Sequence, residues 1–171
     1  MPVGTVNSNF VNNKIFLTKA KRVRNQSAGS PHRPNGLFFF DTGAITIATT
    51  QMDDAGDQVF ALTFPGQCRL IALQVKSSDR DTHATPTLVE DIIAENAAGT
   101  EIVLINDTTI GQGGLSDELD LGLNLFGVDV SAMKLGSRVV TAAATVAAGT
   151  LTYKGLVLIG ALAGDFSSVQ F

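Results

Sequence analysis

Beyond residue 35 the chain alternates apolar and polar side chains with a period of two. The alternation is clearest in residues 58–64, 69–77 and 118–126, where one set of alternate positions is apolar. A period of two is typical of a half-buried β-strand. The pattern predicts about eight to ten strands and no helix of three turns. Residues 86–95 are the segment that best suits a short helix.

Turn residues separate these segments. Pro65 and Gly66 stand between two alternating runs and predict a hairpin or a tight corner. Two Ala-Ala-Gly sequences, at 97–99 and 147–149, predict further turns, and the first of them suits a hairpin. Residues 77–86 are polar, and we expect them to form a solvated loop.

The last long run is apolar on both faces. In an extended strand Leu156 and Leu158 share one face, and Val157 and Ile159 share the other. Such a strand is either central in a sandwich or pressed against another subunit. We therefore expect Leu156 and Leu158, together with Phe171, to contribute to an oligomer interface.

The predicted fold class is all-β. We expect a jelly-roll-like antiparallel β-sandwich at residues 36–171 and an extended N-terminal arm at residues 1–35. About eight strands in about 130 residues suit a two-sheet sandwich, and a jelly roll fits that count best. An immunoglobulin-like sandwich often carries a Cys or Trp core signature, whereas this chain has one Cys and no Trp.

Composition adds a hint about the surface. Apolar residues make up 44% of the chain, and charged residues only 16%, below the share of about a quarter that is usual in soluble proteins. Either sister subunits cover much of the surface, or the body is well packed with small exposed residues. Residues 156–164, the longest apolar stretch, are too short to span a bilayer, and the N-terminal sequence lacks the plan of a secretory signal. We expect no membrane partner and folding in a cytoplasm.

Charge is divided unequally along the chain. Residues 1–35 contain six Lys and Arg and no acid, a net charge of +6, whereas residues 36–171 contain the other six cations and all sixteen acids, a net charge of −10. Such asymmetry is a signature of an interaction arm. Three interpretations are open: the arm docks on an acidic protein surface, binds nucleic acid, or is a solvated tail.

Protein docking is the favoured interpretation of the arm. Nucleic acid is disfavoured because no aromatic side chain is interleaved among the cations between positions 19 and 33 for base stacking, and the acidic body would repel phosphates. The residues expected to make the protein contacts are the cations and an apolar insert of the arm: Ile15, Phe16, Leu17, Lys19, Lys21, Arg22, Arg24 and Arg33.

No set of residues predicts catalysis. The candidate metal ligands are Asp79, Asp81 and His83 in one group and Asp53, Asp54 and Asp57 in another. Neither group has the further ligands of a complete coordination shell. The chain has two His, one Tyr and no Trp. It therefore contains few of the residues needed for a nucleophilic triad or for an aromatic platform that binds sugar. We expect no catalytic residue, no cofactor and no metal, although the sequence leaves metal binding by the first group open.

Four short motifs within residues 44–162 carry a resemblance. They are F-P-G-x-C-R-L at 64–70, T-P-T-L at 85–88, A-A-G-T-E at 97–101 and T-A-A-A-T-x-A-A-G-T-L-T at 141–152, the last interpreted as a closing hairpin. In this order they resemble small structural proteins of tailed-bacteriophage virions. The resemblance implies a β-sandwich subunit, as a trimer, that decorates or cements a capsid and reaches across the shell with its N-terminal arm.

The function that follows from the resemblance is that of a non-enzymatic virion protein. Its partners would be the major capsid protein or other virion proteins and further copies of itself, and it would assemble in the host cytoplasm. The alternative is a tail, spike or head-fibre module that recognises a host glycan or receptor through loops 79–83 and 111–117. The position in the particle, the copy number, the partner surface and the strand order stay open at this stage.

Overall fold

The computed structural model describes residues 36–113, 116–119 and 127–160, and within them every regular element is a β-strand. The ten strands are β1 (Gly36–Asp41), β2 (Ile45–Ile47), β3 (Gln58–Thr63), β4 (Cys68–Ser77), β5 (Val89–Glu95), β6 (Glu101–Thr108), β7 (Ser116–Leu119), β8 (Val128–Asp129), β9 (Lys134–Thr141) and β10 (Gly149–Ile159).

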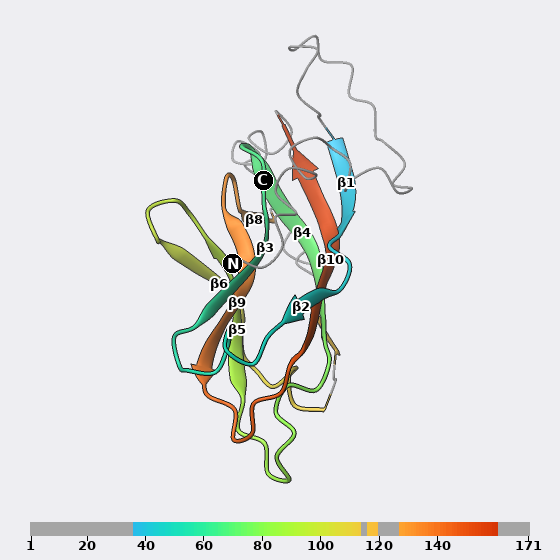
Figure 1. Cartoon of the computed structure of the whole chain (residues 1–171). Coiled ribbons are helices and arrows are strands. Elements are labelled where there is room, and N and C mark those ends of the chain that lie inside the picture. Colours follow the sequence, from blue (N-terminus) through green and yellow to red (C-terminus); the bar gives the residue numbers. More distant parts are fainter. Residues whose placement is uncertain (1–35, 114–115, 120–126, 161–171) are drawn as a thin grey trace.

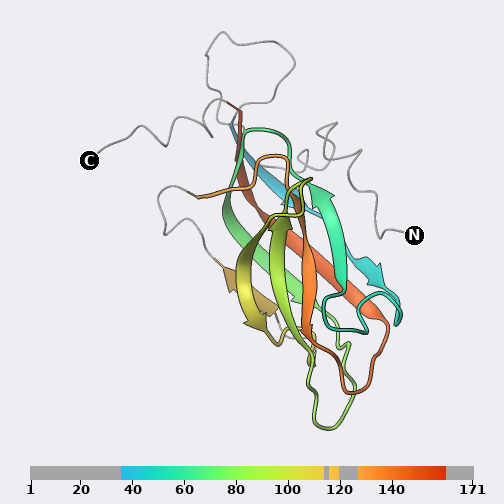
Figure 2. The same cartoon turned by 90° about the vertical axis from the view of Figure 1, so that its left-hand side faces the viewer.

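The strands form two sheets, which lie side by side when the molecule is seen as in Figure 1. Sheet A follows the order β1-β10-β4-β7, with β2 also pairing with β10 and β8 also pairing with β4. Sheet B follows the order β3-β9-β5-β6. In Figure 2 sheet B lies in front of sheet A, with β6 towards one side and β1 towards the other. All strand pairs are antiparallel.

The prediction of an all-β antiparallel sandwich is confirmed. The predicted strand at 118–126 corresponds to β7, which covers Ser116–Leu119, and the rest of that segment lies outside the described residues. The N-terminal arm, residues 1–35, also lies outside them. No helix among the described residues is long and apolar enough to cross a membrane.

The short helix proposed for residues 86–95 is wrong, because β5 occupies Val89–Glu95 in the middle of sheet B. Ile92 and Ala94 belong to the core, and Glu90 is fully buried beside them. Acids reduce strand propensity, but pairing of β5 with strands on both sides satisfies its backbone, and β-branched Val89, Ile92 and Ile93 suit a pleated surface. Tertiary pairing therefore decides the conformation.

The turn predictions have different outcomes. Residues 97–99 do form a hairpin between β5 and β6, in which the Asn96 side chain accepts the N–H groups of Ala98 and Thr100 at 2.9 Å and Gly99 takes a positive φ of 79°. The segment at Pro65 and Gly66 is a corner, since β3 and β4 belong to different sheets.

The closing hairpin expected at 141–152 is wrong. β9 lies in sheet B and β10 in sheet A, so the Ala-rich segment between them crosses the sandwich. Its backbone is tied to the loop that follows β4: Ala147 N–H donates to the carbonyl of Arg80 at 3.0 Å, and Thr82 N–H donates to the carbonyl of Thr145 at 3.1 Å. These bonds satisfy backbone groups that a hairpin would have paired within itself.

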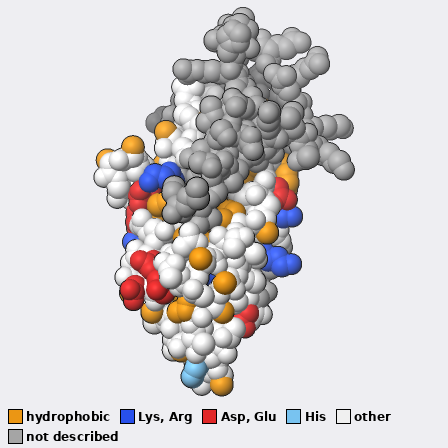
Figure 3. Space-filling model, in the orientation of Figure 1, with side chains coloured by type: hydrophobic (Ala, Val, Ile, Leu, Met, Phe, Trp, Pro, Cys, Tyr) orange, Lys and Arg blue, Asp and Glu red, His pale blue; other side chains and the backbone are white. Residues whose placement is uncertain are grey.

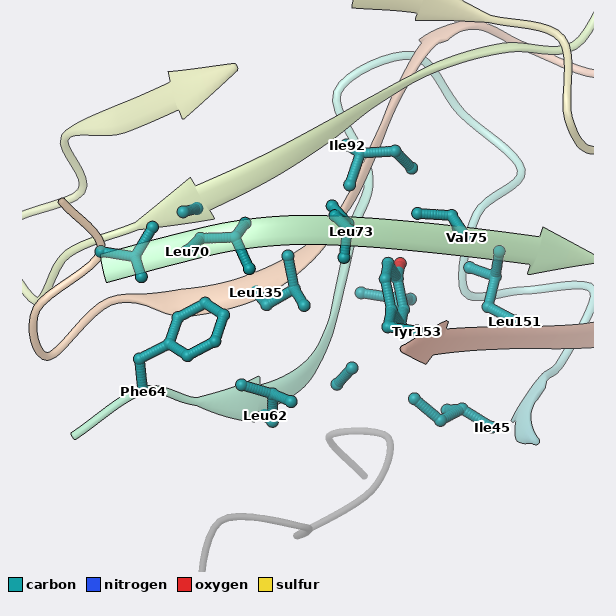
Figure 4. Close-up of a cluster of buried hydrophobic side chains, with 14 of the residues drawn as sticks. Ile45, Leu62, Phe64, Leu70, Leu73, Val75, Ile92, Leu135, Leu151 and Tyr153 are labelled. Carbon is teal, nitrogen blue, oxygen red and sulfur yellow. The ribbon is translucent and has the colours of Figure 1, made fainter. Parts of the chain in front are cut away.

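The core fills the space between the sheets. Alternate residues of the strands point inwards, and Figure 4 shows Leu70, Leu73 and Val75 of β4 beside Leu151 and Tyr153 of β10, with Leu62, Phe64 and Leu135 from the side of sheet B. The rings of Phe40 and Phe64 meet edge to face at 5.8 Å. Each fully buried large apolar side chain contributes about 1.5–3 kcal/mol, so this layer is the main source of stability.

Gly155 is required where β1, β10 and β4 approach each other. A Cβ at this position would lie 2.3 Å from the carbonyl oxygen of Ala72 and 2.7 Å from the ring of Phe40. The glycine therefore leaves the space that the Phe40 ring fills, and it explains why a central strand tolerates a residue of low β propensity.

Candidate interaction surfaces

The outer face of sheet A carries an apolar row. Leu156 and Leu158 are absent from the core cluster that contains Val157 and Ile159, so they face outwards from β10. Across the pair with β1, Leu156 lies opposite Phe39 and Leu158 opposite Leu37. Leu156, Phe39 and Leu37 are half-buried, and Leu158 is only 8% exposed. These four residues, Leu37, Phe39, Leu156 and Leu158, are called the apolar row below.

The outer face of sheet B carries a group of charged side chains. Arg138 on β9 binds Asp91 on β5 at 2.6 Å and also pairs with Glu101 on β6. The hydrogen bond with Asp91 raises the pKa of Arg138. Lys134 binds Glu95 at 2.9 Å and its Nζ lies 4.4 Å from the centre of the Phe60 ring. Figure 3 shows acidic side chains gathered on the left, the side on which sheet B lies in Figure 1.

Among the described residues sheet B has two edge strands, β3 and β6. β6 pairs with β5 on one side, and no described strand pairs with its other side. Ile102, Leu104 and Ile105 pack partly against the core, whereas Val103 is 42% exposed. The strand ends in acids, Glu101 at its start and Asp107 next to its end. Edge strands present unpaired backbone groups and are sites where another strand can add.

A further ion pair is enclosed between the sheets. Arg80 and Glu90 form a bidentate pair in which both side chains are buried, with exposures of 3% and 0%. Arg80 Nε also donates to Ser77 Oγ at 2.9 Å. The hydroxyl groups of Tyr153 and Ser137 bond each other at 2.8 Å, and burial raises the pKa of Tyr153.

Asp81 ties three segments of backbone together. Its carboxylate accepts N–H groups from the residues that follow it and from the β9–β10 crossing: His83, Thr87, Leu88, Ala144 and Thr145, at 2.7–3.3 Å. Burial by itself raises the pKa of Asp81, but the backbone N–H groups outweigh it and hold the pKa well below the usual range. We call this arrangement the Asp81 staple.

The expectation that residues 77–86 are a solvated loop is therefore wrong in part. Ser77, Arg80 and Asp81 are buried, whereas Asp79 and the tip at 82–85 are exposed. Neither periodicity nor composition could reveal this, because the buried polar groups are satisfied by partners as distant in sequence as Thr145. The ion pair and the staple are the features that sequence reasoning missed.

The candidate metal ligands are not gathered into a site. The oxygens of Asp81 are occupied by backbone N–H groups, Asp79 accepts the Asp81 N–H at 3.2 Å, and His83 Nδ1 contacts the backbone of Thr85. In the second group, Asp57 accepts the N–H groups of Asp53 and Asp54 and so closes a turn. No group of three His, Cys, Asp or Glu that could hold a metal occurs in the described part of the chain.

The arm residues expected to bind protein, Ile15, Phe16, Leu17, Lys19, Lys21, Arg22, Arg24 and Arg33, lie outside the described residues, as does Phe171. Their roles remain predictions. Of the expected interface residues, Leu156 and Leu158 are described and lie side by side with β1 on the outer face of sheet A.

Comparisons with known proteins reveal similarity of fold. No protein-family model matches the sequence, and no curated protein matches it. A chain from the capsid of Ralstonia phage GP4 is 19% identical with a TM-score of 0.58, and the match covers 91% of this chain and 97% of that one. A chain from the cyanophage Pam1 capsid asymmetric unit is 19% identical with a TM-score of 0.57, covering 84% of this chain and 99% of that one. The β-sandwich of this protein is thus similar to chains found in two phage capsids.

Proposed function

We propose that this protein is a non-enzymatic structural subunit of a bacteriophage virion that decorates or cements the capsid. The observation that carries the proposal is the similarity of fold over 97–99% of the length of two chains from phage capsids. The sandwich itself supports a structural role, because its buried polar groups are engaged with each other or with backbone and leave their chemistry internal to the fold.

The jelly-roll interpretation belongs to this proposal. Jelly rolls have eight strands in two Greek keys and occur in viral capsid domains. We count β1 and β2 as one strand and β8 as an addition to the edge formed by β7. Each sheet then has four strands, and in sheet A the first strand lies next to the last. This order supports a jelly-roll capsid module.

Assembly would use the two features named from the sequence. The apolar row suits an oligomer interface, with Leu156 and Leu158 at its centre, and a trimer is the proposed state. The basic arm fastens the subunit to the major capsid protein or to neighbouring copies. Each exposed ion pair contributes only about 0–1 kcal/mol, so fastening depends on apolar contacts of the arm and on the number of copies that bind together.

The test is the composition of purified particles made by the genome that encodes this chain. We expect the chain in a fixed ratio to the major capsid protein, and a lower occupancy when Lys19, Lys21 and Arg22 are each replaced by Glu. The matched control is Lys76→Glu, which reverses an exposed charge on β4. Particles that form and mature without this chain in them would contradict the proposal.

A second function is favoured by one observation. The exposed tip at residues 82–85 is held by the Asp81 staple at the end of the sandwich opposite to Gly36 and Ile159. A rigid loop presented away from the rest of an assembly suits recognition of a host glycan or receptor. Binding to a glycan array that is lost on replacing Thr82, His83 and Thr85 by Ala would favour this function over cementing.

A further inference from the structure

The open edge of β6 is the place in the described structure that best fits the chain's own arm. Two other edges, those of β1 and β3, are less suitable for a cationic segment. β1 carries Asp41, which is already bound to Lys154 at 3.0 Å, and β3 has Lys134 above its Phe60 ring. Around β6 the outer face of sheet B has four carboxylates, Asp91, Glu95, Glu101 and Asp107, against the two cations Lys134 and Arg138. Electrostatics therefore favours a positive partner here.

β6 also has an apolar pattern that a strand could continue. Its central residues 102–105 are all Ile, Val or Leu, and they lie between Glu101 and the pair Asn106 and Asp107. Native edge strands are usually blunted by Lys, Pro or a covering segment, yet β6 contains no Lys or Pro. A partner strand with apolar residues in its middle and cations at its ends would bury Val103 and match the acids.

Residues 14–19 have that complementary pattern. The sequence Lys-Ile-Phe-Leu-Thr-Lys places three apolar residues between two cations. In an antiparallel register with Lys19 opposite Glu101, Leu17 falls opposite Val103 and Phe16 opposite Leu104. Directly opposed residues share one face of a sheet. Leu17 would then cover exposed Val103, and Phe16 would lie on the side of the core.

We propose that residues 14–19 of a neighbouring copy add to the free edge of β6 as an antiparallel strand. A neighbour is favoured because the arm leaves from Gly36 on β1, and β1 and β6 lie on opposite sides of the molecule in Figure 1. A donor on one side and an acceptor on the other produce a head-to-tail contact, which gives a ring where the rotation between copies closes and a filament where it does not. The inference deepens the proposed function and rests on it for the assembled state.

The test is disulfide trapping between two purified full-length variants, Leu17→Cys and Val103→Cys, mixed in solution under mild oxidation. The native Cys68 is fully buried, so it gives little background. The matched control for Val103→Cys is Val140→Cys, because Val140 on β9 is also a well-exposed valine, at 38%. We expect a heterodimer of the first pair at about ten times the yield of the control pair, because docking raises the effective concentration of the two thiols.

Three results would overturn the inference: equal yields for Val103→Cys and Val140→Cys, no heterodimer at all, or a cross-link confined within single chains that carry both Leu17→Cys and Val103→Cys. Charge provides a second measurement. Lys14→Glu with Lys19→Glu is expected to lower the yield about five- to tenfold, whereas Lys76→Glu leaves it unchanged. The trapping experiment needs no virus particle, so the two proposals can fail separately. A failure to trap the pair would not affect the particle test of the proposed function. Absence of the chain from particles would not affect a trapped pair.

Discussion

Two arginine–carboxylate clusters, one between the sheets and one on the outer face of sheet B, use the same chemistry in different surroundings. Arg80 and Glu90 are closed off between the sheets, with exposures of 3% and 0%. On the outer face Arg138 is 31% exposed and pairs with Asp91, which is 4% exposed, and with Glu101, which is 19% exposed. Removing charges from water is costly, and the pair repays the cost only while both partners are present. On the outer face water and salt compete with the pair.

The difference in surroundings gives the two clusters different roles. The enclosed pair fixes the position of the loop after β4 against β5, because any other packing would bury an unpaired charge. The outer cluster can rearrange at little cost and is therefore free to respond to a partner. We expect the enclosed pair to determine how the loop packs in the fold, and the outer cluster to change its contacts when a partner binds.

The largest expected effect is that of Glu90→Leu. The substitution leaves the Arg80 guanidinium buried and without its carboxylate, and we expect the free energy of unfolding to fall by about 3–5 kcal/mol. Urea denaturation is the suitable measurement, since urea does not screen charge. The matched control is the double variant Arg80→Met with Glu90→Leu, which should recover most of the loss. A loss below about 1 kcal/mol for Glu90→Leu would remove the contrast between the two clusters.

The next effect concerns the Asp81 staple, a buried carboxylate that binds backbone in place of a cation. Asp81→Asn exchanges one acceptor oxygen for an N–H₂ donor that faces backbone N–H groups, and we expect a loss of about 2–3 kcal/mol. Asp79→Asn is the control, because Asp79 is exposed and accepts a single N–H; its effect should stay within about 0.5 kcal/mol.

The staple also predicts a dependence on pH. The pKa of Asp81 is lowered in the folded state, so its contribution is present above the unfolded value of about 3.9 and is lost as the pH falls through the lowered pKa. The difference in unfolding free energy between the native chain and Asp81→Asn should therefore be constant near neutral pH and shrink below about pH 4. A difference that stays constant down to strong acid would contradict the staple.

A smaller effect is expected on the outer face. Arg138→Met removes both of its ion pairs, and the carboxylate of Asp91, which is only 4% exposed, loses its cation. We expect a loss of about 1–2 kcal/mol in low salt, and a smaller loss in about 1 M NaCl, where the more exposed pair with Glu101 is screened. The comparison is sharpened by measuring Glu90→Leu in the same two buffers, because the effect on an enclosed pair should be almost independent of salt. Equal salt sensitivity of the two variants would break the comparison.

Lys134→Gln should have the smallest effect. Lys134 is 40% exposed, and it binds Glu95 and covers Phe60 at the rim of the same face. Its amide replacement keeps most of the packing and loses only an exposed ion pair and a cation–π contact, so we expect a change within about 0.5 kcal/mol by urea denaturation. A loss as large as that of Arg138→Met would mean that the whole outer face acts as one unit.

The local elements of the fold could be predicted from the sequence because their signals are local. Strict alternation identified β4, and the Ala-Ala-Gly sequence identified the hairpin between β5 and β6. The second Ala-Ala-Gly sequence has the same letters but a different role. Its backbone is held by Arg80 and Asp81, which are more than 60 positions away, and no local pattern contains that information.

Burial of polar residues was the part that sequence could not supply. Arg80 and Asp81 stand in a stretch of Ser, Asp, Thr and His that has the composition of an exposed loop. Both are nevertheless buried, because Arg80 pairs with Glu90 and Asp81 accepts N–H groups that include that of Thr145. Alternation placed Leu156 and Leu158 on one face of their strand but did not decide that this face points outwards. The neighbours that make an apolar row of them, Phe39 and Leu37, depend on the pairing of the first strand with the last.

The Asp81 staple has a kinetic consequence. Its bond to Thr145 joins positions 64 residues apart, and it can form only after the β9–β10 crossing has reached the loop that follows β4. Contacts of such long range close late, because the entropy of ordering the intervening chain is lost before they form. Asp81→Asn should therefore leave the refolding limb of a chevron plot nearly unchanged and raise the unfolding limb. The staple would then slow unfolding and so determine the lifetime of the folded subunit.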